Sequence, residues 1–318
     1  MFKVLAYITA YQDRDALYQC IQSIQQQNYS VDKIVIVDNS PSSLIQNRTY
    51  CCQSVDTLVW HYPENIGISG GLGQVIPWAK EQGYDFVWLF DQDSEPSLDC
   101  LHHLIHAYER LAADCLIAIV APIAIDPRTK YIIAPVNFIN DGFREVKHLE
   151  NEQAYLCDSP ITSGSLLCLK AADSVSLPDF RLFIDGVDLD YGFRLTQAGY
   201  RNFVIPSAVL RHNFGEPTVV RLFGECFFFQ EYSALRYYYI CRNHTYLELK
   251  FSKGLYRKFT CGLRRIQFLA ARIARLFVGA TDYKFQKIYA CLSGTYYGFT
   301  GNLDRQFWGR EENFSQDL

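Results

Sequence analysis

The chain has 318 residues and a mass of 36.7 kDa; 49% of its residues are hydrophobic and 20% are charged. This composition allows a large buried core and excludes wholesale disorder. The net charge of −4 argues against nucleic acid as a partner, and a run of about 18 apolar residues, which a membrane-spanning helix needs, does not occur. The eleven cysteines include no C-x-x-C pair. We therefore expect reduced thiols and a cytoplasmic location.

The first 120 residues alternate between strand and helix patterns. Continuous apolar, β-prone runs occupy 3–9, 33–38, 58–62, 86–90 and 117–122. Helical spacing occupies 13–27, 69–82 and 97–113. Alternation with short connections predicts an α/β fold, in which a mostly parallel sheet is covered by helices on both faces. In such a sheet a ligand binds at the carboxyl ends of the strands.

Polar side chains follow four of these strands, and they include Thr9, Asp38, Asn65 and Asp91. Acids and amides at such positions also cap the helices that follow, so each residue alone has a plain structural explanation. Because all four strand ends meet at one edge of the sheet, we expect the residues together to form a pocket of nucleotide size.

Asp91 and Asp93 form a D-x-D pair directly after the strand at 86–90. Two carboxylates one residue apart can share a divalent cation, and oxygen ligands suit Mg²⁺ or Mn²⁺ carrying a diphosphate. A D-x-D pair is common, but its place at the end of a buried strand favours a site of this kind.

Other phosphate-binding motifs fit less well. The glycine segment that follows Asn65 is G-x-x-G-G-x-G, without the G-x-G-x-x-G of dinucleotide-binding folds. A G-x-x-x-x-G-K-[ST] loop and a G-x-S-x-G nucleophile elbow do not occur in the sequence.

A compact acidic cluster lies on a predicted helix from residue 186 to 199, with Asp188 and Arg194 away from its apolar face. A further strand run at 202–206 leads to His212.

Six segments occur in an order and spacing that resemble those of family 2 glycosyltransferases of the GT-A fold. They are VDNS (37–40), NIGISGG (65–71), FVWLFDQDSEPS (86–97), ITSGSLL (161–167), LFIDGVDLDYGFRLTQAGY (182–200) and RHNFG (211–215). The DQDS motif together with RYYYICRNHTYL (236–247) is similar to the bacterial rhamnosyltransferase branch, to which galactofuranosyltransferases are related. The resemblance covers residues 1 to 247 and predicts a GT-A fold.

The resemblance implies a nucleotide site. By the family pattern, Thr9 and Asp38 hold the base, Asn65 contacts the nucleotide, and Asp91 contacts the sugar nucleotide.

The resemblance also implies a metal site, in which Asp91 and Asp93 bind the ion. His212 matches the third metal ligand of the galactofuranosyltransferases. A buried, hydrogen-bonded histidine is the plain alternative for His212.

For the catalytic base, the family pattern selects Asp188, with Asp190 and Arg194 at the matching later positions. Relatives often have two adjacent acids here, whereas Val187 precedes Asp188 in this chain, so the base could instead be Asp185 or Asp190. A solvated acid paired with an arginine is the plain alternative for Asp188.

Glycosyl transfer to an acceptor hydroxyl needs a carboxylate that removes its proton and a metal that stabilises the departing nucleoside diphosphate. An unpaired acid, a D-x-D pair and a distant histidine meet these needs. We expect four further residues to border the donor or acceptor site: Arg236, Tyr238, Arg242 and Asn243.

The charge of the chain is unevenly distributed. Residues 250–287 contain ten basic residues and one acidic residue, a balance of +9, which leaves 20 basic and 33 acidic residues, or −13, elsewhere. From 259 to 277 apolar residues recur on one face of a predicted helix, with arginines opposite. This pattern is typical of an interfacial membrane helix. The alternative is a helix packed on the catalytic domain with a basic face toward solvent.

We therefore predict a GT-A catalytic domain over residues 1–220 and a mainly helical, basic region over 221–318. The resemblance implies an inverting glycosyltransferase that depends on Mg²⁺ or Mn²⁺ and transfers L-rhamnose from dTDP-L-rhamnose. Its acceptor would be a saccharide or a lipid-linked saccharide in surface polysaccharide synthesis. The enzyme would then work in the cytoplasm, at the inner face of the membrane.

Three alternatives stay open. The donor could be UDP-galactofuranose or a UDP-hexose, or the chain could be a non-catalytic, membrane-associated assembly protein with the same fold. A nucleotidyltransferase is disfavoured, because its glycine-rich loop would follow the first strand, where this chain has Thr9-Ala10-Tyr11-Gln12.

Overall fold

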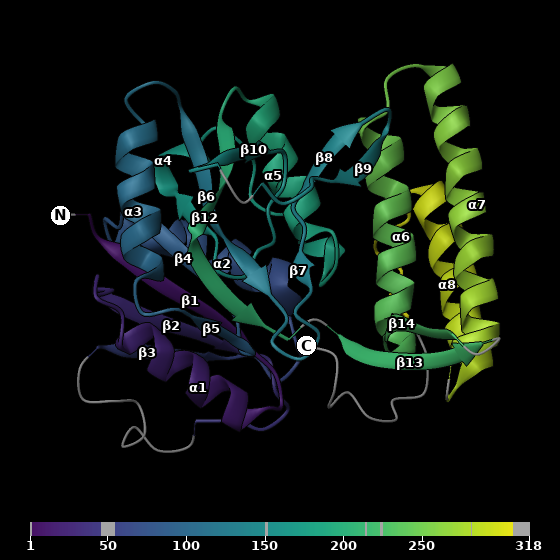
Figure 1. Ribbon diagram of the computed structural model, residues 1–318, viewed down its shortest axis with the longest axis horizontal. Helices are drawn as coiled ribbons and strands as arrows, with labels where there is room; N and C mark the ends of the chain where they lie inside the picture. The colour runs from purple at the N-terminus through teal and green to yellow at the C-terminus, as the bar shows by residue number, and fades with distance from the viewer. Residues whose placement is uncertain are drawn as a thin grey trace.

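The computed structural model describes residues 2–45, 55–149, 152–213, 215–222, 225–280 and 282–307. Its centre is a ten-stranded mixed sheet with the order β10-β12-β6-β11-β4-β1-β2-β3, to which β5 and β7 add at the edges of β12 and β6 (Figure 1). The strands of this sheet are β1 (Val4–Ala10), β2 (Lys33–Asp38), β3 (Thr57–His61), β4 (Phe86–Asp91), β5 (Ser94–Pro96), β6 (Ile117–Ile125), β7 (Ile132–Ile133), β10 (Tyr155–Cys157), β11 (Leu166–Cys168) and β12 (Arg201–His212).

The predicted parallel arrangement is confirmed for the first four strands: β1 lies between β2 and β4, β3 extends the sheet beyond β2, and all these pairs are parallel. The antiparallel β11 was not predicted. It inserts between β4 and β6 and makes the sheet mixed.

The helices of the sheet domain are α1 (Arg14–Gln25), α2 (Gly67–Glu81), α3 (Cys100–Leu111), α4 (Leu169–Ala172) and α5 (Val187–Gln197). Helix α1 shows why the sequence folds in this way. The Asp13 carboxylate accepts a hydrogen bond from the Ala16 backbone N–H and caps the first turn. Leu17, Ile21 and Ile24 recur at helical spacing and are buried against the sheet.

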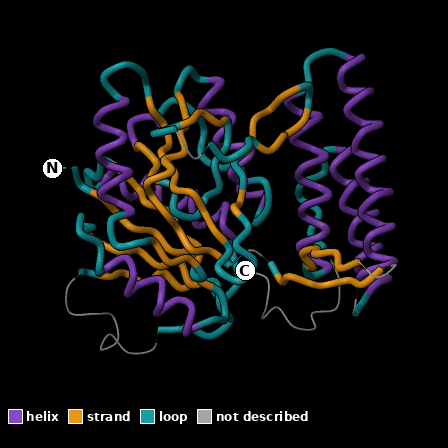
Figure 2. Tube along the Cα trace, viewed as in Figure 1, coloured by secondary structure: helices purple, strands orange, loops and turns teal. Residues whose placement is uncertain are grey.

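The C-terminal part adds three long helices, α6 (Ala234–Phe251), α7 (Leu255–Gly279) and α8 (Lys284–Thr300), which pack together beside the sheet domain (Figures 1 and 2). Two small sheets flank them: β8 (Val136–Ile139) pairs with β9 (Gly142–Glu145), and β13 (Glu216–Leu222) pairs with β14 (Glu225–Glu231). None of the described helices, the 25-residue α7 included, has an apolar stretch of the length and hydropathy that crosses a bilayer.

Helix α7 turns part of its basic face toward the protein, which differs from the packed helix with its basic face toward solvent. The Arg264 guanidinium lies 3.3 Å from the buried Glu248 carboxylate and donates to the Asn140 carbonyl at 3.0 Å. Arg265 is 5% exposed and lies 3.8 Å from the same Glu248. Charge pairing with Glu248 therefore orients the helix, so that part of the opposite, apolar face of α7 lies at the surface.

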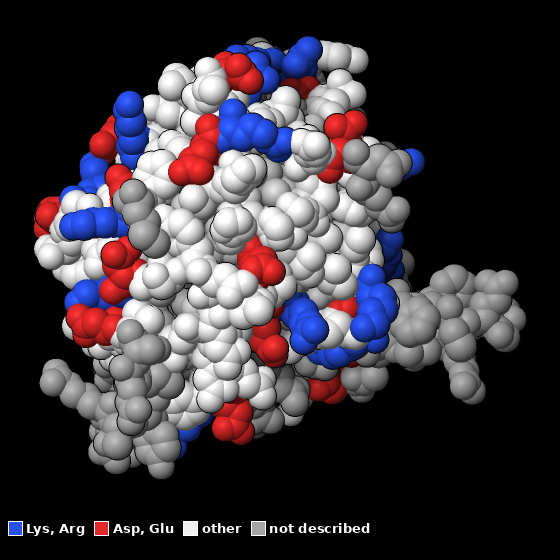
Figure 3. Space-filling view, turned by 60° about the vertical axis from the view of Figure 1, so that its left-hand side comes forward, with Lys and Arg blue, Asp and Glu red and all other residues white. Residues whose placement is uncertain are grey.

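Figure 3 shows one face of the molecule, on which Lys and Arg lie in small groups among Asp and Glu around a broad uncharged area. Charges of both signs are therefore mixed on this face, and it lacks the broad basic surface that nucleic acid binding requires.

Candidate active site

The strand register brings the predicted nucleotide-site residues to one edge of the sheet. Thr9 on β1 pairs with Asp91 on β4, and Ala10 pairs with Asp38 on β2. The Gln92 side chain fastens this edge: it accepts from the Tyr11 backbone N–H at 2.7 Å and donates to the Tyr11 carbonyl at 2.8 Å. Three neighbouring strands thus end at one place, as ligand sites in such sheets require.

Asp38 is fully buried and shapes the loop that follows β2. Its carboxylate accepts hydrogen bonds from the Ser40 backbone N–H at 3.0 Å, the Leu44 backbone N–H at 2.7 Å and the Ser43 hydroxyl at 3.1 Å. Thr9, also buried, donates from Oγ1 to the Tyr7 hydroxyl at 2.8 Å. Asp38 therefore holds the backbone after β2, whereas Thr9 is held by another side chain at the end of β1.

Asn65 opens the glycine segment with a φ of +52°, and its Oδ1 accepts from the Gly67 backbone N–H at 3.0 Å. Gly67 has a φ of +67°, and a Cβ there would lie 2.5 Å from the Phe183 carbonyl oxygen. Only glycine fits both the backbone conformation and this close approach. The glycine segment is thereby held against the turn that leads into the acidic cluster.

The D-x-D pair belongs to a chain of buried polar groups. The Ser163 hydroxyl donates to Asp91 Oδ2 at 3.0 Å and lies 3.0 Å from the Ser94 hydroxyl. The Ser94 hydroxyl lies 2.9 Å from His212 Nδ1, which is in turn 3.3 Å from Asp93 Oδ1. Strand β5, which pairs Ser94 with His212 in register, brings the histidine to the D-x-D pair.

The charges in this group influence one another. Burial raises the pKa of Asp91, and the negative charge of Asp93 adds to this effect. Burial alone would lower the pKa of His212, but the negative charges of Asp93 and Asp91 outweigh it, so the pKa of His212 is raised. His212 is therefore buried and hydrogen-bonded, as its plain alternative expects, and it also lies beside the D-x-D pair.

One buried atom in this group fits a cation. Asp93 Oδ1 is buried, and the His212 ring 3.3 Å away is its one polar contact among the described residues. Buried carboxylate oxygens rarely stay unsatisfied, and an oxygen-binding cation would satisfy this one. In the described parts of the chain, however, no three His, Cys, Asp or Glu side chains are arranged around a common point as metal ligands.

The acidic cluster contains a carboxylate held in its ionised form. Asp185 Oδ1 lies 2.9 Å from His244 Nε2, and Asp185 Oδ2 lies 3.9 Å from Arg236 Nε. Burial alone would raise the pKa of Asp185, but the hydrogen bond to His244 and the charges of His244 and Arg236 lower it below its usual value.

Asp188, at the first turn of α5, behaves in the opposite way. It is half-buried and makes no ion pair with any described residue, so it is not the arginine-paired surface acid of the plain alternative. Burial, followed by the negative charge of Asp185, raises its pKa to about 6. Two neighbouring carboxylates whose pKa values are moved apart are typical of acid–base sites.

Asp190 and Arg194 form a different, largely structural contact. Asp190 is 1% exposed, and its two oxygens contact Arg194 Nε at 2.8 Å and Lys250 Nζ at 2.7 Å. Arg194 also donates to the Ser176 carbonyl at 2.6 Å. Both cations are thus engaged with Asp190, and the pair ties α5 to α6.

Arg242 and Asn243 support the acidic cluster from α6. The Asn243 side-chain amide donates to the Leu182 carbonyl at 2.7 Å and to the Asp185 carbonyl at 2.6 Å, and its Oδ1 accepts from Arg242 Nε at 2.8 Å. These contacts fix the backbone that carries Asp185.

Arg242 itself is fully buried and donates from Nη1 to the carbonyls of Leu303 and Arg305, at 2.9 Å each. Tyr238 donates to the same Arg305 carbonyl at 2.6 Å. Both side chains therefore anchor the segment that follows α8.

Arg236 acts on both halves of the site. Its Nε lies 3.9 Å from Asp185 Oδ2, and its positive charge opposes the rise in the pKa values of Asp91 and His212.

Sequence reasoning missed His244 and Ser163. Arg236 and His244 are eight residues apart, which places both on one face of α6, and this spacing could have revealed the histidine. Ser163 lies within the quoted segment ITSGSLL, but no spacing rule links it to Asp91. Only the insertion of β11 next to β4 brings them together.

Comparison with solved structures identifies the class of fold. The chain is similar to S. aureus TarS 1-349 (TM-score 0.54, 11% identity, 95% of this chain and 82% of that chain). It is also similar to GalNAc-T7 crystallised with UDP, GalNAc and Mn²⁺ (TM-score 0.57, 14% identity, 78% of this chain and 47% of that chain). The chain has the GT-A fold of these glycosyltransferases, as its motifs predict.

Sequence comparison identifies the family. Residues 6–161 match the family described as Glycosyl transferase family 2, so the chain carries a domain of this family. It is 25% identical over 200 residues to the dTDP-rhamnosyl transferase RfbF of Shigella flexneri, covering 63% of this chain and 64% of that protein. It is 22% identical over 209 residues to the galactofuranosyltransferase GlfT1 of Mycolicibacterium smegmatis, covering 62% and 66%. The chain thus matches less than two thirds of either relative.

Proposed function

We propose that the chain is an inverting glycosyltransferase in which Asp188 is the general base and Asp91, Asp93 and His212 form the metal site. The observation that carries this proposal is the pair of Asp185 and Asp188, one held ionised and the other with its pKa raised to about 6. Arg236 lies 3.9 Å from Asp185, and its positive charge also acts on Asp91 of the D-x-D pair.

In an inverting transfer, the acceptor hydroxyl attacks the anomeric carbon from the side opposite the leaving nucleoside diphosphate. Asp188 would accept the proton of that hydroxyl as the bond forms. A carboxylate whose pKa is about 6 is mostly ionised at neutral pH, yet it is a stronger base than an ordinary aspartate.

His244 and Arg236 would act through Asp185. Their contacts keep Asp185 negatively charged, and this charge supports the raised pKa of Asp188. We therefore propose His244 as a positioning residue, together with Asn243, which holds the Asp185 backbone.

Asp91, Asp93 and His212 would hold a Mg²⁺ or Mn²⁺ ion, whose chemistry when bound is Lewis-acid stabilisation of the departing diphosphate. The buried, unsatisfied Asp93 oxygen supports this assignment. Thr9, Asp38 and Asn65 would shape the nucleotide pocket at the strand ends. Asp38 and Asn65 would do so through the backbone they hold, and Thr9 through its hydrogen bond to Tyr7.

For the donor we propose dTDP-L-rhamnose, because the named function of the Shigella flexneri relative is dTDP-rhamnosyl transfer. UDP-galactofuranose is the second candidate, supported by the similarity to GlfT1. A saccharide acceptor carried on a lipid would suit work at the cytoplasmic face of a membrane, with residues 221–318 making the membrane contact and residues 1–220 the catalytic domain.

Nucleotide selectivity tests the donor assignment. With Mn²⁺ present, we expect dTDP at about 100 times its Kd to raise the Tm by about 5 °C, because binding to the folded state alone stabilises it. UDP at the same concentration should raise the Tm less. Thermal-shift measurement with both nucleotides, repeated in EDTA, provides the comparison.

A larger shift with UDP would contradict the rhamnose assignment and favour the galactofuranose or hexose donor. A shift with neither nucleotide, together with no turnover of either sugar nucleotide, would favour the non-catalytic assembly protein.

A further inference from the structure

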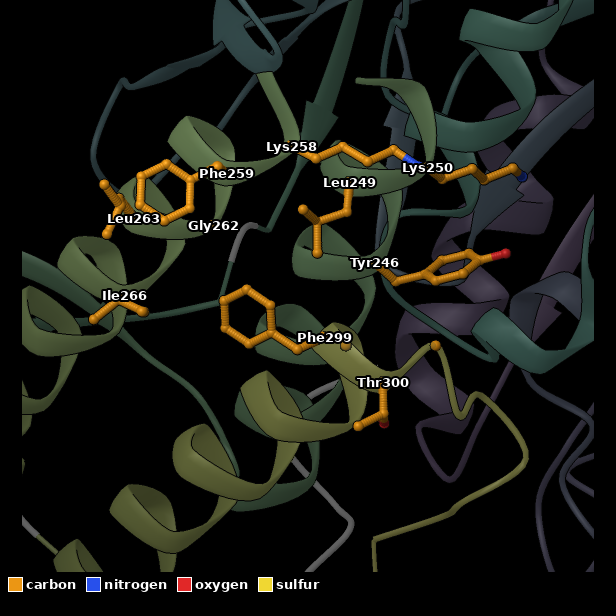
Figure 4. Close-up of a pocket in the computed structure, with 12 residues that line it drawn as sticks. Tyr246, Leu249, Lys250, Lys258, Phe259, Gly262, Leu263, Ile266, Phe299 and Thr300 are labelled. Atoms are coloured by element: carbon orange, nitrogen blue, oxygen red, sulfur yellow. The ribbon is translucent and has the colours of Figure 1, made fainter. Parts of the chain in front are cut away.

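An apolar groove lies where α6, α7 and α8 meet (Figure 4). Its volume is ≈ 570 Å³. The side chains of Phe259, Leu263 and Ile266 from α7 and Phe299 from α8 surround the space, with Leu249 of α6 above it. We call this feature the α7–α8 groove.

Large apolar side chains around the groove are exposed. Phe259 is 65% exposed, Leu263 47% and Ile266 52%, although large hydrophobic side chains are usually buried. Other apolar residues of the same two helices are also more than one-third exposed: Leu255, Tyr256, Phe277, Val278, Phe285, Tyr289, Leu292 and Tyr296. So many exposed apolar side chains on two helices favour a binding function for this part of the chain.

The charges around the groove favour an anionic occupant. None of the residues that line it is acidic, and two of them, Lys250 and Lys258, are lysines along its edge (Figure 4). Lys250 is engaged with Asp190 at 2.7 Å, which it shares with Arg194. Lys258 is exposed and has no ion-pair partner in the described ranges, so its charge is available to a ligand.

Two arginines of α7 are directed into the molecule. Arg264 and Arg265 are engaged with Glu248 inside the molecule. The α7–α8 groove is thus lined by apolar side chains, and Lys258 is the ammonium group at its edge that has no ion-pair partner in the described ranges. This combination matches one apolar chain that carries one anionic group.

We propose that the α7–α8 groove binds the hydrocarbon chain of an anionic lipid, and that Lys258 pairs with the phosphate of the headgroup. The inference rests on the membrane contact proposed above and deepens it by naming the binding site. It does not depend on which sugar is transferred.

Gly262 offers a sharp test, because it lines the groove and lies within α7. A Cβ added there would meet Phe299 Cε1 at 3.4 Å, an ordinary contact, so Gly262→Leu should fill the groove without disturbing the backbone. The change also makes the surface more apolar. Occupancy of the groove therefore predicts weaker binding, whereas non-specific adhesion to an apolar surface predicts equal or stronger binding.

The probe is dodecyl phosphate below its micelle concentration, with inorganic phosphate and dodecyl maltoside as comparisons, and binding is measured by calorimetry. We expect the chain to bind dodecyl phosphate more tightly than either comparison. Gly262→Leu should weaken this binding about tenfold, and Lys258→Glu at least about fivefold. Lys170→Glu, an exposed charge reversal on α4, is the matched control and should bind as the unaltered chain does.

Unchanged binding in Gly262→Leu, or equal binding of inorganic phosphate and dodecyl phosphate, would overturn the proposal. So would a dimer in light scattering that Leu263→Glu dissociates, because a second copy would then cover the face. Binding of dTDP with Mn²⁺ is measured on the same samples to separate the two proposals. If neither the unaltered chain nor any variant binds dTDP, the result counts against the proposed glycosyltransferase and not against the groove.

Discussion

Replacing Asp188 with asparagine should reduce the rate of sugar transfer by about 10²- to 10⁴-fold, the usual contribution of a general base. Asparagine keeps the size of the side chain, and its Oδ1 can accept the hydrogen bond from the Leu189 backbone N–H that Asp188 accepts at 2.9 Å. What it loses is the ability to take up a proton. The initial rate of product formation, measured at saturating donor and acceptor, gives the effect.

The same variant should fold at least as stably as the unaltered chain at neutral pH. A carboxyl group whose pKa is raised from 3.8 to about 6 in the folded state destabilises the fold as pH rises through that interval, and the penalty persists above it. Asparagine removes this penalty. Lost activity with an unchanged or higher Tm would therefore identify a functional role.

Asp190→Asn, two residues along the same helix, is the informative control. Asp190 is buried between Arg194 and Lys250, so its neutralisation leaves two cations without their partner and should lower the Tm. If Asp188→Asn retained normal turnover while Asp185→Asn lost it, the base would be Asp185 and the present assignment would be wrong.

Replacing Asp93 with asparagine should weaken the binding of dTDP in the presence of Mn²⁺ by about 100-fold or more. Even residues that only orient metal ligands contribute about 10- to 100-fold to metal affinity, and Asp93 offers a charged, buried oxygen directly. Titration calorimetry of dTDP, with Mn²⁺ and again with EDTA, measures the change.

Without the metal, the variant and the unaltered chain should bind dTDP equally, because Asp93 would act through the cation. Asp114→Asn, an exposed acid between α3 and β6, should behave as the unaltered chain in both conditions. Full Mn²⁺-dependent binding by Asp93→Asn would exclude this aspartate from the metal site.

Local patterns in the sequence predict the part of the fold that surrounds the nucleotide pocket. The run at 33–38 coincides with β2, the run at 3–9 differs from β1 by one residue at each end, and the run at 86–90 is one residue shorter than β4. Continuous β-branched and aromatic residues bounded by polar turns specify such buried strands by themselves. The positions of Thr9, Asp38 and Asp91 at one sheet edge follow from this pattern.

Contacts between distant segments could not be predicted in the same way. Arg242 and Asn243 share a motif with Arg236, but their side chains are directed at backbone carbonyls of residues about 60 positions away. Helical spacing predicts which residues share a face of a helix, but it does not predict which other segment packs against that face. The orientation of α7 is a similar case, because the buried Glu248 that pairs with Arg264 lies on another helix.

The central claim is that Asp188 is a base whose pKa is set by burial and by the charge of Asp185, and the pH dependence of kcat/KM tests it most directly. We expect the rate to rise with pH around a midpoint near 6, since only ionised Asp188 accepts a proton. In Asp185→Asn, which can still accept the hydrogen bond from His244, the midpoint should move to lower pH. A rate that does not change between about pH 5 and 8, or a midpoint that stays in place in Asp185→Asn, would contradict the account.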